Sequence, residues 1–338
     1  MSTFSVGASS EPSFRIAILD DYSHVSLKCA DWASILARAQ IDIYDTTEFD
    51  EDKLAKRLEP YSVICTMRER TRFPASLFAK LPSLRLLTTT GQTNRAIDLQ
   101  AAHDRGIIVA GTTGRGTATL EHIWALILST VRHIVVEDAL MKNASPQWQT
   151  AMPLGLSGRT LGLLGVGRLG TSTALIAKAF GMRVIGWSPH LTPERAVTAG
   201  VEFVSTKERL LEQSDVVSLH LVLSDSTRHI LKAADLARMK PAAFLINTSR
   251  GPLIEEDALL QALEAGTIAG AGLDVFDIEP LPLNHPIRKA PNVTLSPHTG
   301  YISDATYEEF WSQTVNNVKN FLDGEHENIL LLKPPPPI

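Results

Sequence analysis

The sequence predicts an α/β protein with two doubly wound parallel-sheet domains, one inserted in the other. The chain of 338 residues is too long for one compact core and suits two domains of ordinary size. Hydrophobic residues make up 44% and charged residues 20%, as in an average globular protein. Short apolar runs alternate with helix-length segments along most of the chain, which is typical of parallel sheets with helical crossovers.

The first series of apolar runs begins near Phe14. Residues 1–13 are small and polar, and we expect them to form a disordered leader. The runs that follow predict five parallel strands, at residues 15–19, 41–44, 63–66, 86–89 and 107–109.

A long helical pattern at residues 117–143 connects the first series to a second one. The second series predicts six parallel strands, at residues 160–166, 183–187, 216–219, 243–247, 269–273 and 293–295. A last helical pattern, residues 304–322, is expected to pack back on the first domain and to leave a Pro-rich tail. The expected domains are residues 14–113 with 300–338, and residues 114–299.

A glycine-rich turn opens the second domain. Residues 160–170 read TLGLLGVGRLG, an apolar strand that leads into Gly165, Gly167 and Gly170 and then into a helical pattern. The first glycine permits a tight turn, the second lets backbone N–H groups approach a pyrophosphate, and the third lets helix and strand pack closely. The turn, with Arg168 and Leu169, therefore predicts a dinucleotide site; the alternative is a glycine turn without a ligand.

The next strand ends at Trp187 and is followed by Ser188, where a site specific for NAD usually has an acidic residue. Serine does not repel a 2′-phosphate, and His190 and Arg195 follow close by. NADP is therefore the favoured cofactor. NAD stays the alternative, with Ser188 merely capping the turn.

Three polar segments follow later strands of the same predicted sheet, where open α/β sheets place their sites. They are residues 247–252 with Arg250, residues 273–280 with Asp274 and Glu279, and residues 296–300 with His298. Alone, each residue would more often be structural, as an ion pair, a turn residue or a packed histidine. Their shared location favours a reactive site.

These segments, together with SDVVSLH at 214–220 and IDLQAAHDRGI at 97–107, resemble the D-isomer-specific 2-hydroxyacid dehydrogenases, a family that includes D-3-phosphoglycerate dehydrogenase and glyoxylate/hydroxypyruvate reductase. The resemblance implies a Rossmann cofactor domain inserted in a flavodoxin-like substrate domain. It also implies NAD(P)-dependent interconversion of a small 2-keto acid and its D-2-hydroxy acid, by a homodimer.

The resemblance assigns the catalytic roles to Arg250, Glu279 and His298. Reduction of a ketone by hydride leaves an alkoxide, so a proton donor must stand beside the oxygen, and histidine suits that task. A carboxylate beside the imidazole holds one tautomer and favours its protonated form, which is the role expected of Glu279. The planar guanidinium of Arg250 would bind the substrate carboxylate and carbonyl.

Further site residues also follow from the resemblance. Asp274 would bond the nicotinamide carboxamide, and His220 and Thr248 would line the cofactor pocket. In the first domain, Arg68 and the turn at Gly91 and Gln92 would bind the substrate, the turn through its backbone N–H groups.

Composition argues against other classes of protein. The formal net charge is -5 and no long run of Lys or Arg occurs, so nucleic acid is not an expected partner. Cys29 and Cys65 lack metal-ligand spacing, and no apolar run suits a bilayer, which predicts a metal-free cytoplasmic protein without a membrane partner. The long helix has more apolar residues than one face needs, which suggests a partner surface, the alternative being burial within one chain: Trp124, Leu126, Ile127, Val131, Ile134 and Val135.

Two other functions fit this fold. One is a scaffold like the C-terminal-binding-protein corepressors, which bind the cofactor with little turnover. The other is a formate dehydrogenase relative, but such enzymes have Gln where Glu279 stands, since hydride leaving formate needs no proton acceptor.

Overall fold

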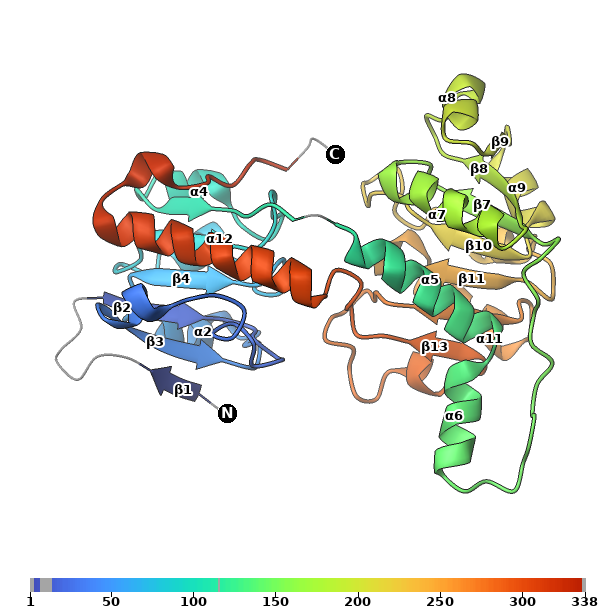
Figure 1. Ribbon diagram of the computed structural model, residues 1–338, viewed down its shortest axis with the longest axis horizontal. Coiled ribbons are helices and arrows are strands. Elements are labelled where there is room, and N and C mark those ends of the chain that lie inside the picture. The colour runs from blue at the N-terminus through green and yellow to red at the C-terminus, as the bar shows by residue number, and fades with distance from the viewer. Residues whose placement is uncertain (1–2, 7–13, 115, 336–338) are drawn as a thin grey trace. The chain divides into compact units, whose positions relative to one another are not determined.

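The computed structural model describes residues 3–6, 14–114 and 116–335, and the chain forms two compact units (Figure 1). Unit 1 contains the described residues up to 114 together with residues 303–335, and unit 2 contains residues 116–302. Unit 2 is thus inserted in the chain of unit 1. Each unit is a sheet with helices on both faces, parallel throughout in unit 2 and parallel except for its first strand in unit 1, which confirms the predicted fold class.

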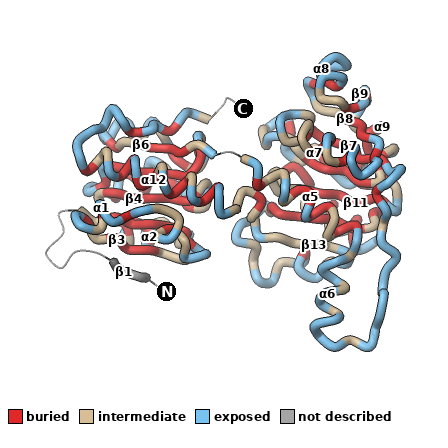
Figure 2. The backbone as a smooth tube through the Cα atoms, viewed as in Figure 1, coloured by how far each residue is buried: buried red, intermediate tan, exposed pale blue. Residues whose placement is uncertain are grey.

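Unit 1 has a sheet in the order β1-β3-β2-β4-β5-β6. All five predicted strands are present and parallel: β2 (Phe14–Ile18), β3 (Ala39–Tyr44), β4 (Val63–Thr66), β5 (Leu86–Thr89) and β6 (Ile108–Ala110). β4 and β5 are buried along their whole length, and Figure 2 shows β4 as a buried strand. Burial on both faces explains why these strands read as continuous apolar runs.

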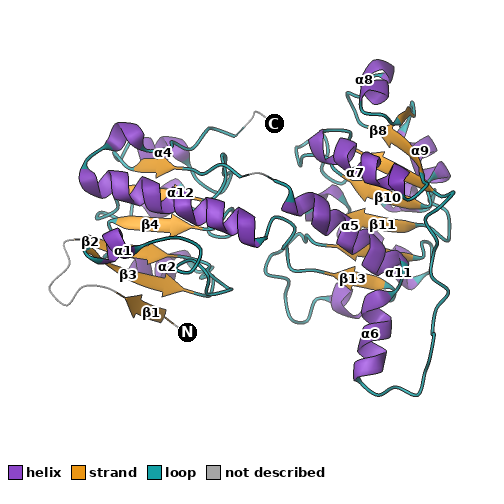
Figure 3. Cartoon of the chain, viewed as in Figure 1, coloured by secondary structure: helices purple, strands orange, loops and turns teal. Residues whose placement is uncertain are grey.

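The helices of unit 1 cover both faces of this sheet (Figure 3). Buried side chains of three short helices share one apolar core: α2 (Glu51–Leu58), α3 (Ala75–Phe78) and α4 (Leu99–His103). Two others contact each other, α1 (Ala33–Leu36) and α12 (Asp304–Asp323), and α12 also contacts β5. α12 begins at the N-cap Ser303, ends at the left-handed Gly324, and is followed by the 3-10 turn η3 (His326–Asn328). Its Trp311 is fully buried against Trp32.

The start of the chain differs from the sequence-based expectation. Within the predicted leader, β1 (Thr3–Val6) pairs antiparallel with β3, with Thr3 opposite Tyr44. Without this pairing β3 would be an edge strand with unpaired backbone groups. Residues 1, 2 and 7–13 lie outside the described residues.

Unit 2 has a seven-stranded parallel sheet in the order β13-β12-β11-β10-β7-β8-β9. The six predicted strands are β7 (Thr160–Leu164), β8 (Arg183–Trp187), β10 (Val216–Leu219), β11 (Phe244–Asn247), β12 (Gly270–Leu273) and β13 (Val293–Leu295). The seventh, β9 (Glu202–Phe203), was not predicted because two residues are too few to set a pattern. Strand order reverses between β7 and β10, and ligands of open α/β sheets bind at such a reversal.

Two apolar cores cover the two faces of this sheet. One contains side chains of α5 (Ala118–Val131) and α7 (Arg168–Ala179). The other contains side chains of α9 (Lys207–Gln213), α10 (Ala233–Leu236) and α11 (Glu256–Glu264). The remaining short elements are α8 (Pro193–Thr198), η1 (Gly251–Leu253) and η2 (Pro286–Lys289).

The long helix predicted at residues 117–143 is two helices, α5 and α6 (Ile134–Lys142). The break lies at His133, which has a left-handed backbone with φ 55°. The carbonyl of Val131, which a continuous helix would bond to residue 135, instead accepts the N–H of Leu154 at 2.9 Å. The residues expected to form a partner surface therefore fall on two helices. Ile134 and Val135 of α6 are exposed. The other four lie on α5 and are buried within unit 2: Trp124, Leu126, Ile127 and Val131.

Three further features bear on expectations from the sequence: membrane-spanning helices, clusters of metal-ligating side chains and the two cysteines. Across residues 3–6, 14–114 and 116–335, no helix combines the length and apolar character that a bilayer crossing requires. The same residues hold no cluster of three His, Cys, Asp or Glu side chains suited to a metal ion. Cys29 and Cys65 are free thiols, and burial raises the pKa of Cys65 to about 12.

Candidate active site

The glycine turn joins β7 to α7, and two of its glycines are required by close packing. Gly165 has φ 105°, and a Cβ added there would lie 2.7 Å from the carbonyl carbon of His220. A Cβ on Gly170 would lie 2.3 Å from the carbonyl oxygen of Gly165. A Cβ on Gly167 would meet no described atom within 4 Å, so this glycine borders open space. The turn is therefore tight against the protein and accessible at its middle residue.

The N-terminus of α7 is suited to an anion. Gly167 is its N-cap, none of the side chains that the structure describes caps it, and its first turn has no acidic residue. The first N–H groups of a helix lack intrahelical partners and carry a partial positive charge. Arg168 donates to the carbonyl of Gly116 at 3.3 Å, and the carbonyl of Leu169 accepts from Thr173 at 2.8 Å. These features fit a dinucleotide pyrophosphate.

His220 follows β10 directly and packs behind the glycine turn. Its Nε2 is buried and has no hydrogen-bond partner among the described residues. Burial lowers the pKa of His220 to about 4, so the imidazole is neutral at physiological pH. A buried polar atom without a partner is unusual in a protein interior, and a ligand at the turn is one way to satisfy it.

The residues predicted to select the cofactor follow β8. Ser188 is partly buried, and His190 and Arg195 are exposed. The Arg195 guanidinium donates to the carbonyl of His190 at 2.9 Å, which fixes it next to the end of β8. Thr248, partly buried, follows β11. The predicted cofactor residues thus lie at the carboxyl ends of neighbouring strands in unit 2.

His298 and Glu279 form a close pair. The imidazole Nδ1 lies 2.5 Å from Glu279 Oε2, and Glu279 Oε1 accepts the N–H of Phe276 at 2.8 Å. Since an ionised carboxylate only accepts, Nδ1 donates in this bond, and Nε2 is the ring atom that can exchange a proton. The side chains of His298 and Glu279 are 34% and 32% exposed, so both are accessible to small molecules.

Arg250 lies on the loop between β11 and η1, and its backbone is held in two ways. Asn247, buried at the end of β11, donates its Nδ2 to the carbonyl of Arg250 at 2.8 Å and accepts the N–H of Ser249 at 3.0 Å. A Cβ on Gly251 would lie 2.2 Å from the carbonyl carbon of Phe276. The Arg250 loop therefore packs directly against the loop that leads to Glu279, and the three predicted catalytic residues follow three adjacent strands, β11, β12 and β13.

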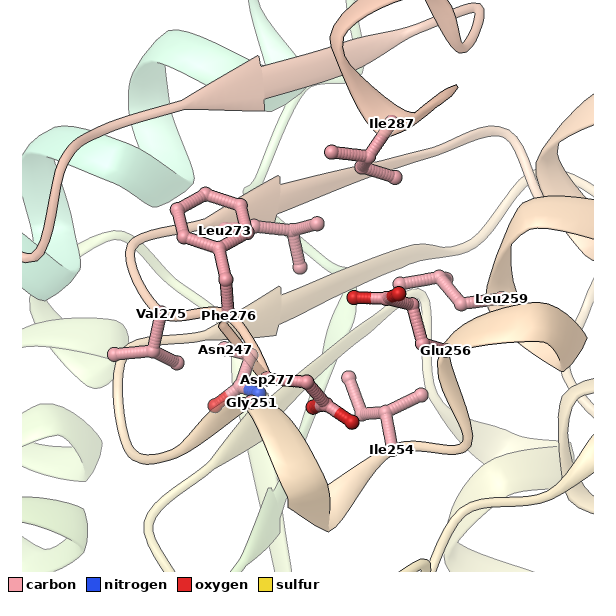
Figure 4. Close-up of a pocket in the computed structure, with 10 residues that line it drawn as sticks. All are labelled: Asn247, Gly251, Ile254, Glu256, Leu259, Leu273, Val275, Phe276, Asp277 and Ile287. Atoms are coloured by element: carbon pink, nitrogen blue, oxygen red, sulfur yellow. The ribbon is translucent and has the colours of Figure 1, made fainter. Parts of the chain in front are cut away.

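A small pocket lies beneath these two loops (Figure 4). It is lined mostly by apolar side chains and by two carboxylates: Asn247, Gly251, Ile254, Glu256, Leu259, Leu273, Val275, Phe276, Asp277 and Ile287. Burial, followed by the charge of Glu256, raises the pKa of Asp277. Glu256 also bonds His285 at 2.9 Å. Arg250, Glu279 and His298 are not among the residues that line it.

Asp274 is buried and engaged by its own chain. Its Oδ1 accepts from Ser296 Oγ at 2.6 Å and from the Thr299 N–H at 2.9 Å, and its Oδ2 accepts from the Gly300 N–H at 2.9 Å. Burial raises the pKa of Asp274, but hydrogen bonds from His122 and Ser296 outweigh it and hold the pKa below its ordinary value. Asn247, His122 and Ser296 were not predicted as site residues. Asn247 and Ser296 carried a signal, since each opens a polar segment that contains a predicted catalytic residue, whereas His122 carried none.

The predicted substrate residues of unit 1 lie together after β4 and β5. Arg68 has a left-handed backbone with φ 53°, and a Cβ on Gly91 would lie 2.0 Å from its Nη1. Asn94 Nδ2 donates to the carbonyl of Arg68 at 2.6 Å. The N–H of Gly91 donates to Thr112 Oγ1 at 2.8 Å, so one of the two backbone donors predicted for the substrate already has a partner within the chain.

Comparison with known proteins adds independent information. Residues 124–300 match the family model described as the NAD-binding domain of D-isomer-specific 2-hydroxyacid dehydrogenases. The chain is 37% identical to a glyoxylate reductase of Korarchaeum cryptofilum over 272 residues, which covers 77% of this chain and 82% of that one. It is 31% identical to a hydroxypyruvate reductase of Blautia hydrogenotrophica over 325 residues, which covers 94% and 99%.

A solved structure extends the likeness to the fold. The crystal structure of a phosphoglycerate oxidoreductase from Vibrio cholerae matches with a TM-score of 0.86 and 33% sequence identity. The match covers 92% of this chain and 99% of that one. Both units are therefore included in the similarity.

Proposed function

Because the chain belongs to the family of D-isomer-specific 2-hydroxyacid dehydrogenases, we propose that it reduces a small 2-keto acid to the D-2-hydroxy acid. It is an NAD(P)-linked oxidoreductase. Relatives named glyoxylate reductase and hydroxypyruvate reductase support a small keto acid as the substrate. The single observation that carries the proposal is the His298–Glu279 pair, whose glutamate follows a loop that packs against Gly251, the neighbour of Arg250.

In this proposal, residues 114–299 bind the cofactor, and residues 14–113 with 300–338 bind the substrate. A bound nicotinamide supplies the hydride that forms the new C–H bond. The imidazolium of His298 gives its Nε2 proton to the carbonyl oxygen, and Glu279 holds the ring in one orientation through its bond with Nδ1. In the reverse direction, the same nitrogen accepts the hydroxyl proton.

The arginines bind the substrate. Arg250 offers several N–H donors in one plane, which suits a carboxylate with the adjacent carbonyl oxygen and stabilises the negative charge that develops there. In unit 1, Arg68 and the N–H of Gln92 would contact the substrate. Support comes from two contacts that fix the Arg68 loop. The Arg68 guanidinium packs on Gly91, and Asn94 Nδ2 donates to the carbonyl of Arg68.

The direct experiment is a panel of 2-keto acids, each assayed with NADPH and with NADH. We expect oxidation of the reduced cofactor with glyoxylate, hydroxypyruvate or a larger homologue, and D configuration in the product. Purified protein that binds the cofactor tightly but turns over no acid in the panel would reject the proposal and favour the corepressor-like scaffold.

We expect Ser188→Asp to shift cofactor preference toward NADH. A carboxylate at the end of β8 would repel a 2′-phosphate and could accept a hydrogen bond from the ribose 2′-hydroxyl. The ratio of kcat/KM with NADH to kcat/KM with NADPH should rise about tenfold or more, because like charges in contact cost more than about 1.4 kcal/mol. Ser83→Asp, on an exposed turn of unit 1, is the matched control. An unchanged ratio in Ser188→Asp would remove residue 188 from the selection of cofactor.

We also propose that the enzyme is a homodimer. Support comes from exposed apolar side chains gathered on α6 and the segment after it: Ile134, Val135, Val136, Met141, Trp148 and Met152. Exposed apolar side chains in this number are more typical of an interface than of a monomer surface. Sedimentation should give the mass of two chains, and Val135→Asp together with Met141→Asp should yield one chain. A monomeric wild type at micromolar concentration would contradict this.

A further inference from the structure

His298 has a backbone conformation that needs support. Its φ of 52° lies in the left-handed region, which residues other than glycine adopt only at an energetic cost. Asp274 binds the chain on both sides of it: Ser296 donates its hydroxyl to the carboxylate, and the N–H groups of Thr299 and Gly300 donate to its two oxygens. The carboxylate of Asp274 therefore fixes the segment 296–300 and, with it, the direction in which the His298 side chain leaves the backbone.

A fourth donor completes this arrangement. His122 lies on α5, the helix that covers β12 and β13 (Figure 1), and its Nε2 is 2.9 Å from Ser296 Oγ and 3.1 Å from Asp274 Oδ1. The Ser296 hydroxyl proton is directed to Asp274, and an ionised carboxylate has no proton to give. Both neighbours of His122 Nε2 are thus acceptors, so this nitrogen carries a proton and donates it.

The surroundings leave little freedom for this cluster. The side chain of Asp274 is only 1% exposed, so an oxygen that lost a donor would not be compensated by bulk water. A Cβ on Gly300 would lie 2.8 Å from Asp274 Oδ2 and 3.4 Å from His122 Cδ2, so carboxylate and imidazole both pack on the backbone of Gly300. A displacement of the His122 ring is therefore transmitted to the segment that carries His298.

We propose that His122 is a positioning residue for the reaction: its Nε2 proton holds the Asp274–Ser296 pair, which fixes the backbone on both sides of His298. This role rests on the proposed function, because it is exerted through the imidazole that exchanges the proton. The proposal also assigns a role to Asp274. With its four hydrogen bonds, this carboxylate orders the segment 296–300 of its own chain.

Two variants of His122 separate a positioning role from simple packing. His122→Gln retains an N–H donor at about the distance of Nε2, whereas His122→Leu fills the space without a donor. We expect the leucine variant to lose about 10- to 100-fold in kcat, as misplaced catalytic groups do, with little change in the KM for NADPH. The glutamine variant should recover most of this loss. His103→Leu, on the exposed part of α4, is the control.

A readout independent of turnover is the amide NMR spectrum of the cofactor-free protein. The Thr299 and Gly300 amide protons donate to a carboxylate and should resonate downfield; they should move upfield in His122→Leu and stay in place in His122→Gln. Thermal unfolding of each variant shows whether it is folded. If the leucine variant kept both amide shifts and its kcat, or if leucine and glutamine reduced kcat equally, the proposal would be overturned.

The same experiment distinguishes this inference from the proposed function. A wild-type protein without turnover on the keto-acid panel would reject the proposed function alone. The amide shifts of Thr299 and Gly300 would still decide whether the His122 proton orders the segment 296–300.

Discussion

Replacement of His298 by alanine is expected to reduce kcat/KM for 2-keto acid reduction by about 10²- to 10⁴-fold, the usual contribution of a positioned general acid. The reason is that the bond between Nδ1 and Glu279 orients the imidazole, and Nε2 is the ring atom that gives the proton in the proposed reaction. The Kd of NADPH should change little, because His298 lies outside the glycine turn. Stopped-flow measurement of NADPH oxidation and a fluorescence titration of NADPH binding check the two parts separately.

Two companion variants make this result specific. Glu279→Gln keeps an acceptor for the N–H of Phe276 but loses the charge, and we expect a smaller decrease than for His298→Ala. His103→Ala, an exposed histidine of α4, should behave as wild type. Near-normal turnover in His298→Ala would remove this imidazole from the mechanism.

The second large effect is expected for Gly251→Ala. The added Cβ would lie 2.2 Å from the carbonyl carbon of Phe276, 2.5 Å from its oxygen and 2.6 Å from the nitrogen of Asp277. All three are backbone atoms, so the loops of Arg250 and Glu279 must separate. We expect a loss of about 1–3 kcal/mol in the free energy of unfolding, as for other overpacked sites, and about a 10²-fold decrease in kcat from misalignment.

Gly155→Ala is the matched control for this substitution. Its Cβ would meet no described atom within 4 Å, and the residue lies on an exposed loop. Urea unfolding and steady-state kinetics of the two variants measure stability and alignment separately. Equal behaviour of Gly251→Ala and Gly155→Ala would mean that the two loops do not depend on each other.

The strands of both sheets could be predicted because most of them are buried on both faces and read as short apolar runs. Elements that depend on distant partners could not. β9 is too short for a pattern, and β1 depends on pairing with β3. The break between α5 and α6 depends on the bond from Leu154 to Val131, which joins residues far apart in sequence. Hydrophobic periodicity alone predicts one continuous helix there.

In the candidate site, as in the fold, some residues could be predicted from the sequence and others could not. Arg250, Glu279 and His298 could be proposed from sequence because each follows a predicted strand of one parallel sheet and because their segments resemble those of a known family, which assigns their roles. His122 could not, since it is 174 residues from Ser296 and its surroundings in the sequence are those of an ordinary buried helix. Asn247 was visible within a polar segment, but its bond to the Arg250 carbonyl is a feature of the loop's conformation and not of its composition.

The insertion of unit 2 has a consequence for biosynthesis. Unit 1 needs α12, whose Trp311 fills its interior, yet that helix leaves the ribosome after all of residues 116–302. The inserted unit has its whole chain available earlier, and domains generally fold as soon as they are complete. Nascent chains long enough to expose residue 302 outside the ribosome should therefore already protect residues 116–302 from protease, while the first hundred residues await the synthesis of α12.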